Sequence, residues 1–212
     1  LDPRRPEGAP EIAFHESTEI LGPVKNQKQP NAAEAAEMRH GYFANISYMD
    51  AQLGKVLDAL ERSGVADRTI ITFASDHGYH IGEHTLWGQP SNFELDARVP
   101  MMIHAPGITH RGERNAARAG LVDLFPTLVE LCRLPTPEGL EGTSLVPVLR
   151  DPSKSVKPAA FTQHPRPAYY DRSPTGQPDV MGVSVRTPEA RYTEWRDWKT
   201  GEPVARELYT AA

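Results

Sequence analysis

Two short segments of the chain are almost entirely apolar, and they limit the folds open to it. Residues 69–75 read Thr-Ile-Ile-Thr-Phe-Ala-Ser, and residues 99–105 read Val-Pro-Met-Met-Ile-His-Ala. A nearly continuous apolar run rich in β-branched residues is typical of a strand that is covered on both faces. Strands of this kind occur in sheets that carry helices on each side, so the two segments predict an α/β fold.

A long amphipathic helix is expected before the first strand. Over residues 40–63, apolar side chains recur at steps of three and four, and the opposite face is polar. Asn31 can cap an earlier start of this helix, and Gly64 can take the left-handed conformation that ends it. The apolar stripe is expected to lie in the core. A helix followed by a buried strand is half of a β-α-β unit, which predicts a mostly parallel sheet with flanking helices.

The composition divides the chain into three parts. Residues 1–39 contain five prolines and are predicted to be an irregular surface segment. Residues 40–155 are expected to belong to the α/β domain. Residues 156–212 are expected to form a small α+β subdomain, because the alternating segments 181–186 and 190–195 indicate an antiparallel hairpin.

Charge and hydropathy exclude several classes of partner. The formal net charge of −5 argues against non-specific binding to nucleic acid or to an anionic membrane. No apolar run approaches the roughly 20 residues that span a bilayer. The chain starts at Leu1 without a signal peptide, so any targeting signal is expected upstream of it. The single cysteine, Cys132, has apolar neighbours and is expected to be a small buried residue.

The segment Ser75-Asp76-His77-Gly78 directly follows the first predicted strand. In open α/β sheets, ligands bind at the carboxyl ends of strands. The carboxylate of Asp76 and the imidazole of His77 are both competent metal ligands, and the glycine lets the backbone approach closely. The same three residues also occur as a capping turn, so the pair by itself leaves both interpretations open.

Several short blocks surround this pair in a fixed order. They are Phe43–Asp50, Gly82–His84, Leu86–Gly88, Ser91–Glu94, Ala97–Ile103, Leu124–Leu128, Gln163–Pro167 and Met181–Thr187. Together they resemble the sulfatase family of the alkaline-phosphatase-like superfamily, and within it the branch of iduronate-2-sulfatase and its bacterial relatives. The resemblance runs from about residue 40 to the end. It implies the C-terminal part of an alkaline-phosphatase-like α/β domain, followed by a truncated C-terminal subdomain.

The resemblance implies that Asp76 and His77 hold one divalent cation, usually Ca²⁺ in this family. Many sulfatases have Asn at the place of His77, whereas His is the pattern of the branch named above. An imidazole is an unusual ligand for a hard cation that prefers oxygen. The alternative is that His77 binds the cation loosely or donates a hydrogen bond to a sulfate oxygen.

The family's nucleophile is a formylglycine made from the first residue of a Cys/Ser-x-Pro-x-Arg motif, and this chain has no such motif. The resemblance therefore implies that a missing N-terminal half supplies the nucleophile and the remaining aspartate ligands. The chain alone is predicted to be inactive. In the implied reaction, the hydrated aldehyde attacks sulfur and releases the alcohol, and its second hydroxyl then expels sulfate.

Gln89 stands where the family has a lysine that contacts the sulfate and the leaving oxygen. Glutamine can donate a hydrogen bond to sulfate but brings no charge. Gln89 is therefore a catalytic candidate with altered chemistry, or else a solvated loop residue. His84 is a second catalytic candidate, as a proton donor or as a partner of the metal ligands. The alternative for His84 is a capping role in its loop.

His164 and Arg166 lie in the Gln-His-Pro-Arg-Pro segment at the predicted subdomain junction. Clefts are common at such junctions. A proline-stiffened loop that carries an imidazole and a guanidinium suits a carboxylate or sulfate on a sugar. Both residues are predicted to bind substrate.

The implied function is hydrolysis of a sulfate ester, on a sulfated sugar or glycosaminoglycan, in a periplasmic, secreted or lysosomal protein. Two alternatives stay open. One is a two-zinc phosphodiesterase or phosphomutase of the same superfold, in which Asp-His-Gly also follows a strand. The other is a non-catalytic remnant that binds sulfated glycans, which Gln89 and the missing half suggest.

Overall fold

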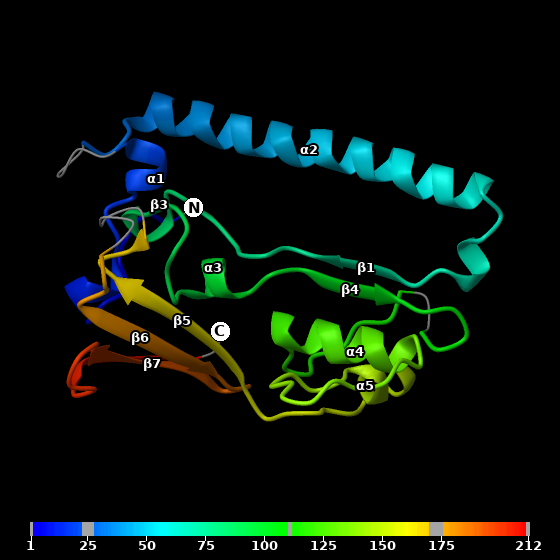
Figure 1. The fold of residues 1–212 in the computed structure, drawn as a ribbon. Helices are drawn as coiled ribbons and strands as arrows, with labels where there is room; N and C mark the ends of the chain where they lie inside the picture. The colour runs from blue at the N-terminus through cyan, green and yellow to red at the C-terminus, as the bar shows by residue number, and fades with distance from the viewer. Residues whose placement is uncertain (1, 23–27, 110–111, 170–175, 211–212) are drawn as a thin grey trace.

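The structure is a computed structural model that describes residues 2–22, 28–109, 112–169 and 176–210 (Figure 1). A long helix, α2 (Ala32–Arg62), runs along one side of the molecule above a pair of strands. Two shorter helices, α4 (Leu124–Leu131) and α5 (Val146–Arg150), lie beneath these strands. The C-terminal part of the chain forms an antiparallel sheet, which lies at the end of the molecule away from α4 and α5 (Figure 1).

Helix α2 begins where Asn31 predicted. The Asn31 side chain accepts hydrogen bonds from the backbone amides of Ala33 and Glu34, at 2.9 and 3.1 Å, and the Glu34 carboxylate accepts from the Asn31 amide at 2.8 Å. This reciprocal capping box satisfies amides that have no partner within the helix. Gly64, with φ +68°, follows the end of the helix in the left-handed conformation. The predicted helix over 40–63 is confirmed, with eight further residues at its start.

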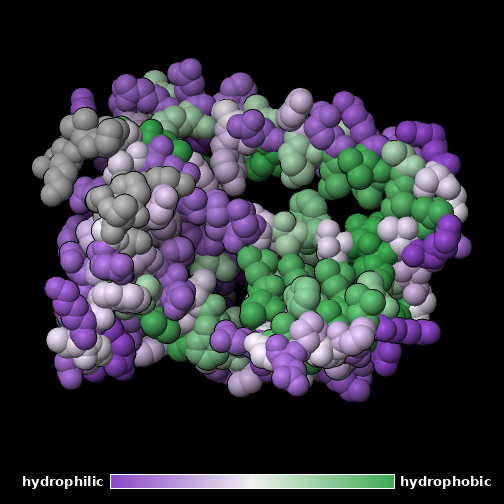
Figure 2. All heavy atoms as spheres, in the orientation of Figure 1, coloured by the Kyte–Doolittle hydropathy of each residue, from purple (hydrophilic) through white to green (hydrophobic). Residues whose placement is uncertain are grey.

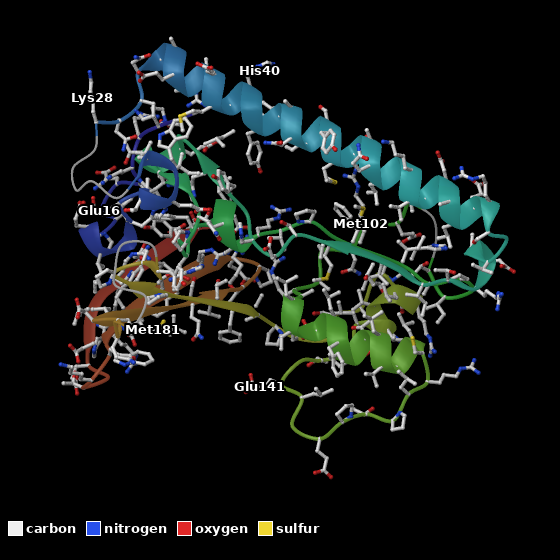
Figure 3. The ribbon with its side chains drawn as sticks, turned by 45° about the horizontal axis from the view of Figure 1, so that its top comes forward. Glu16, Lys28, His40, Met102, Glu141 and Met181 are labelled. Carbon is white, nitrogen blue, oxygen red and sulfur yellow. The ribbon has the colours of Figure 1, made fainter. Side chains whose placement is uncertain are left out.

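The apolar stripe of α2 is largely exposed, which corrects the expectation that it lies in the core. Phe43 is 54% and Val56 64% exposed. Met102, labelled in Figure 3, lies on the side of the strands toward α2 and is itself 58% exposed. Figure 2 shows apolar side chains along both borders of the opening between the helix and the strands. Two strands are too narrow to cover a 31-residue helix, so much of the stripe stays uncovered among the described residues.

The two predicted buried strands are present as β1 (Ile71–Ala74) and β4 (Met101–His104), and they pair with each other. Their register runs antiparallel, from Ile71 opposite His104 to Ala74 opposite Met101. The parallel pairing that the helix-strand order predicted is therefore not found between these two strands. The chain reverses between them through the loops that carry the candidate site.

The C-terminal part forms a four-stranded antiparallel sheet in the order β5-β6-β7-β8. The strands are β5 (Ala160–Arg166), β6 (Val180–Arg186), β7 (Ala190–Asp197) and β8 (Pro203–Thr210). The predicted hairpin is formed by β6 and β7, which confirms the alternation seen in the sequence. On β7 the alternate side chains are buried, and Trp195 is completely inaccessible.

The most buried apolar cluster joins distant parts of the chain. Ala13 and Phe14, next to the short 3-10 helix η1 (Glu11–Ala13), pack with Leu86, Phe93 and Trp195. A second short helix, α1 (Thr18–Leu21), contacts the β3 strand described below. The prediction that residues 1–39 form only a surface segment is therefore wrong for Ala13 and Phe14. Their apolar side chains complete the core of the C-terminal sheet.

The helical segment predicted near residues 121–134 is divided into η4 (Leu121–Asp123) and α4. Asp123 is fully buried, accepts hydrogen bonds from the amides of Gly120 and Thr143, and pairs with Lys157. Cys132 is exposed, which corrects the expectation that it is buried, because it lies past the end of α4 on the outer side. Among the described residues, no helix combines the length and the apolar character that a bilayer span requires.

Candidate active site

Asp76 and His77 lie where the chain leaves β1, as the sequence predicted. The Ser75 hydroxyl donates to the His77 carbonyl at 2.7 Å, and the His77 amide donates to Oδ1 of Asp76 at 3.0 Å. These bonds shape a tight turn. The Asp76 side chain is 86% exposed, so its second oxygen, Oδ2, is open to a ligand.

The imidazole of His77 is oriented toward the same place. Its Nδ1 lies 2.8 Å from the carbonyl oxygen of Gly78, which can only accept, so the hydrogen is on Nδ1. In the neutral ring the lone pair is then on Nε2, which lies 3.7 Å from Oδ2 of Asp76. A backbone carbonyl that fixes the tautomer in this way is the usual support of a metal-binding histidine. The oxygen and nitrogen donors therefore fit one cation between them.

These two donors alone would not complete a metal site. Nowhere in the described part of the chain do three or more His, Cys, Asp or Glu side chains gather in a group that could hold a metal. A divalent cation with oxygen ligands takes six or more donors. Further ligands have to come from outside this set of residues.

Gly78 permits a close approach of a second element. A Cβ at this position would lie 1.8 Å from the carbonyl oxygen of Leu95, in the short helix α3 (Glu94–Ala97). The Gly78 amide donates to the Asp96 carbonyl at 2.8 Å, and the Tyr79 amide donates to the Leu95 carbonyl at 3.1 Å. The metal loop, defined here as residues 76–80, is thus fastened to α3 through its backbone.

A buried pair in this region was not found from the sequence. His80, at the start of β2 (His80–Ile81), has Nδ1 at 2.9 Å from Oδ1 of Asp96. The other oxygen of Asp96 accepts from the amide of Ser91 at 3.0 Å and from its hydroxyl. His80 and Asp96 are 0% and 3% exposed.

His84 is not brought to the Asp76–His77 pair. It lies in η3 (Glu83–Thr85) with φ +56° and packs on Phe93, with ring centroids 4.9 Å apart. Burial, followed by the nearby His80, lowers the pKa of His84. Its ring lines a hollow together with residues of the N-terminal segment, among them Arg4 and Arg5. The structure therefore favours the alternative that His84 shapes its loop.

Gln89 follows β3 (Trp87–Gly88), which pairs with β2. It is half-buried, so the interpretation as a fully solvated loop residue does not hold. Gly88 takes φ +91°, a conformation that turns the chain sharply into this loop. Pro90, next to Gln89, is fixed because its carbonyl accepts a hydrogen bond from Arg166 at 3.1 Å. Gln89 therefore lies in a braced turn.

His164 lies on strand β5, not on a loop as predicted, and it is half-buried. Burial first, and then the charge of Arg166, lower its pKa from 6.5 to about 4, against the opposing effect of Asp96. On the neighbouring strand β6, Gly182 lies opposite His164, and the Gly182 carbonyl accepts a hydrogen bond from the Asn92 side chain, next to α3. At neutral pH its imidazole is uncharged and can donate one hydrogen bond and accept another.

Arg166 was predicted to bind substrate from a loop, but its side chain is surrounded by backbone carbonyls. Its guanidinium donates to the carbonyls of Ile12, Ala13 and Pro90, at 2.9, 2.8 and 3.1 Å, and lies 4.9 Å over the ring of Trp195. The residue is 6% exposed. A planar fork with five donors suits this convergence of carbonyls. The structure thus gives Arg166 the role of joining the N-terminal segment to the C-terminal sheet, which corrects its assignment to substrate.

Comparisons with known proteins agree with this arrangement. The family profile described as Sulfatase matches residues 12–134. Iduronate 2-sulfatase of Mus musculus is 31% identical over 96% of this chain and 47% of its own length. Choline-sulfatase of Rhizobium meliloti (strain 1021) is 43% identical over 52% of this chain and 22% of its own length. The chain thus spans about half the length of the iduronate 2-sulfatases that it matches.

A solved structure shares the fold. BT4656, in complex with its substrate D-glucosamine-2-N,6-O-disulfate, superposes with a TM-score of 0.65 at 26% identity, over 80% of this chain and 33% of the other. This likeness confirms the predicted alkaline-phosphatase-like α/β fold with a C-terminal antiparallel sheet. The matched segment contains the metal loop, α2 and both strands that flank the site. The chain belongs to the sulfatase family.

Proposed function

We propose that this chain supplies part of the active site of a metal-dependent sulfatase that hydrolyses a sulfate ester on a sugar. The observation that carries the proposal is the pair of donors at the end of β1. Oδ2 of Asp76 and Nε2 of His77 lie 3.7 Å apart in a chain of the sulfatase family.

Asp76 and His77 are the residues that would hold the divalent cation, with Ca²⁺ as the expected ion. When bound, the cation would act as a Lewis acid that neutralises charge on the sulfate oxygens. The Gly78 carbonyl keeps the His77 lone pair directed at the ion and makes the imidazole a better ligand. This support offsets part of the mismatch between an imidazole and a hard cation.

The sugar sulfate is proposed from the relatives and from the chemistry of the site. BT4656 was solved with a sulfated glucosamine, and the curated relatives include iduronate 2-sulfatases. His164, uncharged at neutral pH, is suited to hydrogen bonding with a sugar hydroxyl or a sulfate oxygen. Gln89 offers an amide donor for the same purpose from the neighbouring loop.

The remainder of the site is proposed to come from an N-terminal half that carries the formylglycine. In this proposal, residues 40–155 are the C-terminal part of one α/β domain, and further strands fill the space between α2 and the β1–β4 pair. The exposed apolar side chains of Phe43, Val56 and Met102 support this assignment, because little of the described chain covers them.

The experiment is a turnover assay of the whole protein that contains this chain. Substrates are 4-nitrophenyl sulfate and glucosamine and iduronate sulfates, with 4-nitrophenyl phosphate as the counterpart. We expect sulfate release that stops after chelation and returns when Ca²⁺ is added. Two zinc ions per protein together with phosphodiester cleavage would establish the phosphodiesterase alternative instead. Binding of sulfated glycans without turnover would identify a non-catalytic protein.

A further inference from the structure

The buried pair of His80 and Asp96 holds two loops of the candidate site at once. His80 belongs to the metal loop, and Ser91 directly follows the Gln89–Pro90 turn. Oδ1 of Asp96 faces Nδ1 of His80 at 2.9 Å, while its Oδ2 accepts from Ser91. One carboxylate therefore fixes the distance between the metal donors and the turn that carries Gln89.

Asp96 belongs to the short helix α3, which also contacts the C-terminal sheet. Glu94 of α3 accepts hydrogen bonds from Arg191 at 2.7 Å and from Arg186 at 3.2 Å. Arg191 is 6% exposed, whereas the Glu94 side chain is 41% exposed, so the pair lies at the border between the sheet and solvent. Next to the helix, the Asn92 amide donates to the Gly182 carbonyl on β6 at 3.2 Å. Helix α3 is thereby attached to the sheet that carries His164.

Stability alone does not account for the His80–Asp96 pair. A buried polar pair contributes little net stability compared with well-packed apolar side chains of similar volume. In addition, Nε2 of His80 has no hydrogen-bond partner among the described residues, and such a buried orphan atom is costly. The pair instead fixes the orientation of the two loops. The hydrogen bond of Asp96 to His80 orients the metal loop, and its hydrogen bonds from Ser91 orient the Gln89 turn.

We propose that His80 and Asp96 are positioning residues that set the Asp76–His77 pair relative to the Gln89 turn. Neither residue touches substrate or metal in this proposal. The expected effect on the metal and on turnover rests on the proposed sulfatase function. The expected effect on the loops themselves does not, because it follows from the hydrogen bonds alone.

Two substitutions of His80 form a matched pair. In His80→Asn, the side-chain amide occupies the place of Nδ1 and can still donate to Asp96. In His80→Gln, the longer side chain matches the imidazole better in size but presents its amide near the place of Nε2. Asp96→Asn is the third variant. An Asn side chain keeps one oxygen acceptor, so it can accept from His80 or from Ser91 but not from both. A role in packing alone predicts that Gln is tolerated at least as well as Asn, whereas the positioning role predicts the reverse.

The measurements use the whole protein that contains this chain. Amide hydrogen exchange is followed over residues 76–80 and 89–92, together with Ca²⁺ affinity and turnover of a sulfate ester. For His80→Gln and Asp96→Asn we expect faster exchange in both segments and a loss of Ca²⁺ affinity of about 10-fold or more, the size seen when partners of metal ligands are removed. For His80→Asn we expect exchange and affinity within about 3-fold of the original protein.

Three results would overturn the proposal. One is equal behaviour of the Asn and Gln variants at position 80. Another is unchanged exchange in both His80→Gln and Asp96→Asn. A third is that both of these variants fail to fold while His80→Asn folds, which would make the pair a folding determinant. If the original protein binds no cation and hydrolyses no sulfate ester, the proposed function fails, and the exchange data still decide whether the pair positions the loops.

Discussion

The ring of Tyr42 on α2 stacks on the ring of Tyr79 in the metal loop, with centroids 5.4 Å apart and planes 25° from parallel. Close to this contact, Nε of Arg39 donates to the Ile81 carbonyl at 2.8 Å. Helix α2 is therefore fastened at the metal loop, while Phe43 and Val56 remain exposed. The loop is held from two sides, by α2 through Tyr79 and by α3 through Gly78 and His80.

Replacing Asp76 with Ala should abolish metal-dependent sulfatase turnover without unfolding the protein. The carboxylate is exposed and is one of the two proposed donors, so its loss would remove a ligand and little packing. We expect a fall in kcat/KM of about 100-fold or more, because a Lewis acid stabilises the transition state by several kcal/mol. The unfolding free energy should fall by no more than about 1.5 kcal/mol, because the one described hydrogen bond that is lost is the one from the His77 amide. Asp67→Ala, at an exposed aspartate nine residues before Asp76, is the control, and equal metal content in both variants would contradict the assignment.

Replacing Gln89 with Lys should raise sulfatase activity. An ammonium group in this turn would place a positive charge near the developing charge of the leaving oxygen, and a charge-assisted hydrogen bond is about twice as strong as a neutral one. We expect kcat/KM on a sulfated sugar to rise about 10-fold, or about 1.4 kcal/mol. Gln89→Met is the control for side-chain length. An unchanged rate would mean that Gln89 does not face the substrate, and a gain on phosphate esters alone would indicate a changed specificity.

Replacing Arg166 with Met should lower stability more than it affects substrate binding. The substitution leaves the carbonyls of Ile12, Ala13 and Pro90 without their donor, and each buried acceptor left unpaired costs about 1–3 kcal/mol. We expect a loss of about 3 kcal/mol or more in denaturant unfolding. The control Arg196→Met removes a half-exposed arginine and should cost less than about 1 kcal/mol. A selective rise in KM with unchanged stability would restore the prediction that Arg166 binds substrate.

His164 should make stability depend on pH below neutrality. Its folded-state pKa of about 4 lies below the ordinary value of 6.5, because burial disfavours the charged ring. Between these two values the unfolded chain binds a proton that the folded chain does not, so stability falls as pH is lowered from about 6.5 to about 4. His164→Gln removes this contribution and should show a shallower fall in urea unfolding at pH 7, 5.5 and 4.5. Parallel curves for the two proteins would show that His164 is not shielded from water.

The chain expressed without any preceding sequence should hydrolyse no sulfate ester and should unfold over a broad range. It has no Cys/Ser-x-Pro-x-Arg motif, much of its apolar stripe on α2 is exposed, and the outer edges of β1 and β4 pair with no other strand among the described residues. The checks are sulfate release and a thermal melt followed by circular dichroism, with the longer protein as reference. A sharp cooperative transition would show that the chain is a self-sufficient domain.

Features with a local cause were predictable from the sequence. The periodicity of α2, its Asn31 cap, both apolar strands and the β6–β7 hairpin depend on neighbouring residues and were found. The metal loop was placed correctly because a strand end marks it. This part of the candidate site could be predicted because all of its residues belong to one continuous segment of the chain.

Features that depend on distant partners were not predictable. The antiparallel pairing of β1 with β4 is set by the path of the chain between them. Asp96 is 16 residues from His80, and neither stands out until α3 folds against the metal loop. The exposure of Cys132 depends on which side of α4 meets the strands, whereas its apolar neighbours suggested burial.

The hydrogen bond from Arg166 to Ile12 joins residues that are 154 positions apart. During synthesis, Ala13 and Phe14 leave the ribosome long before Trp195, their partner in the core. The entropic cost of closing this loop is only about 0.6 kcal/mol greater than the cost for a loop of half its length. Contacts between residues so far apart in sequence nevertheless slow folding. The side chains of Ala13 and Phe14 therefore stay without their partner Trp195 until the strands β5 to β8 have been synthesised.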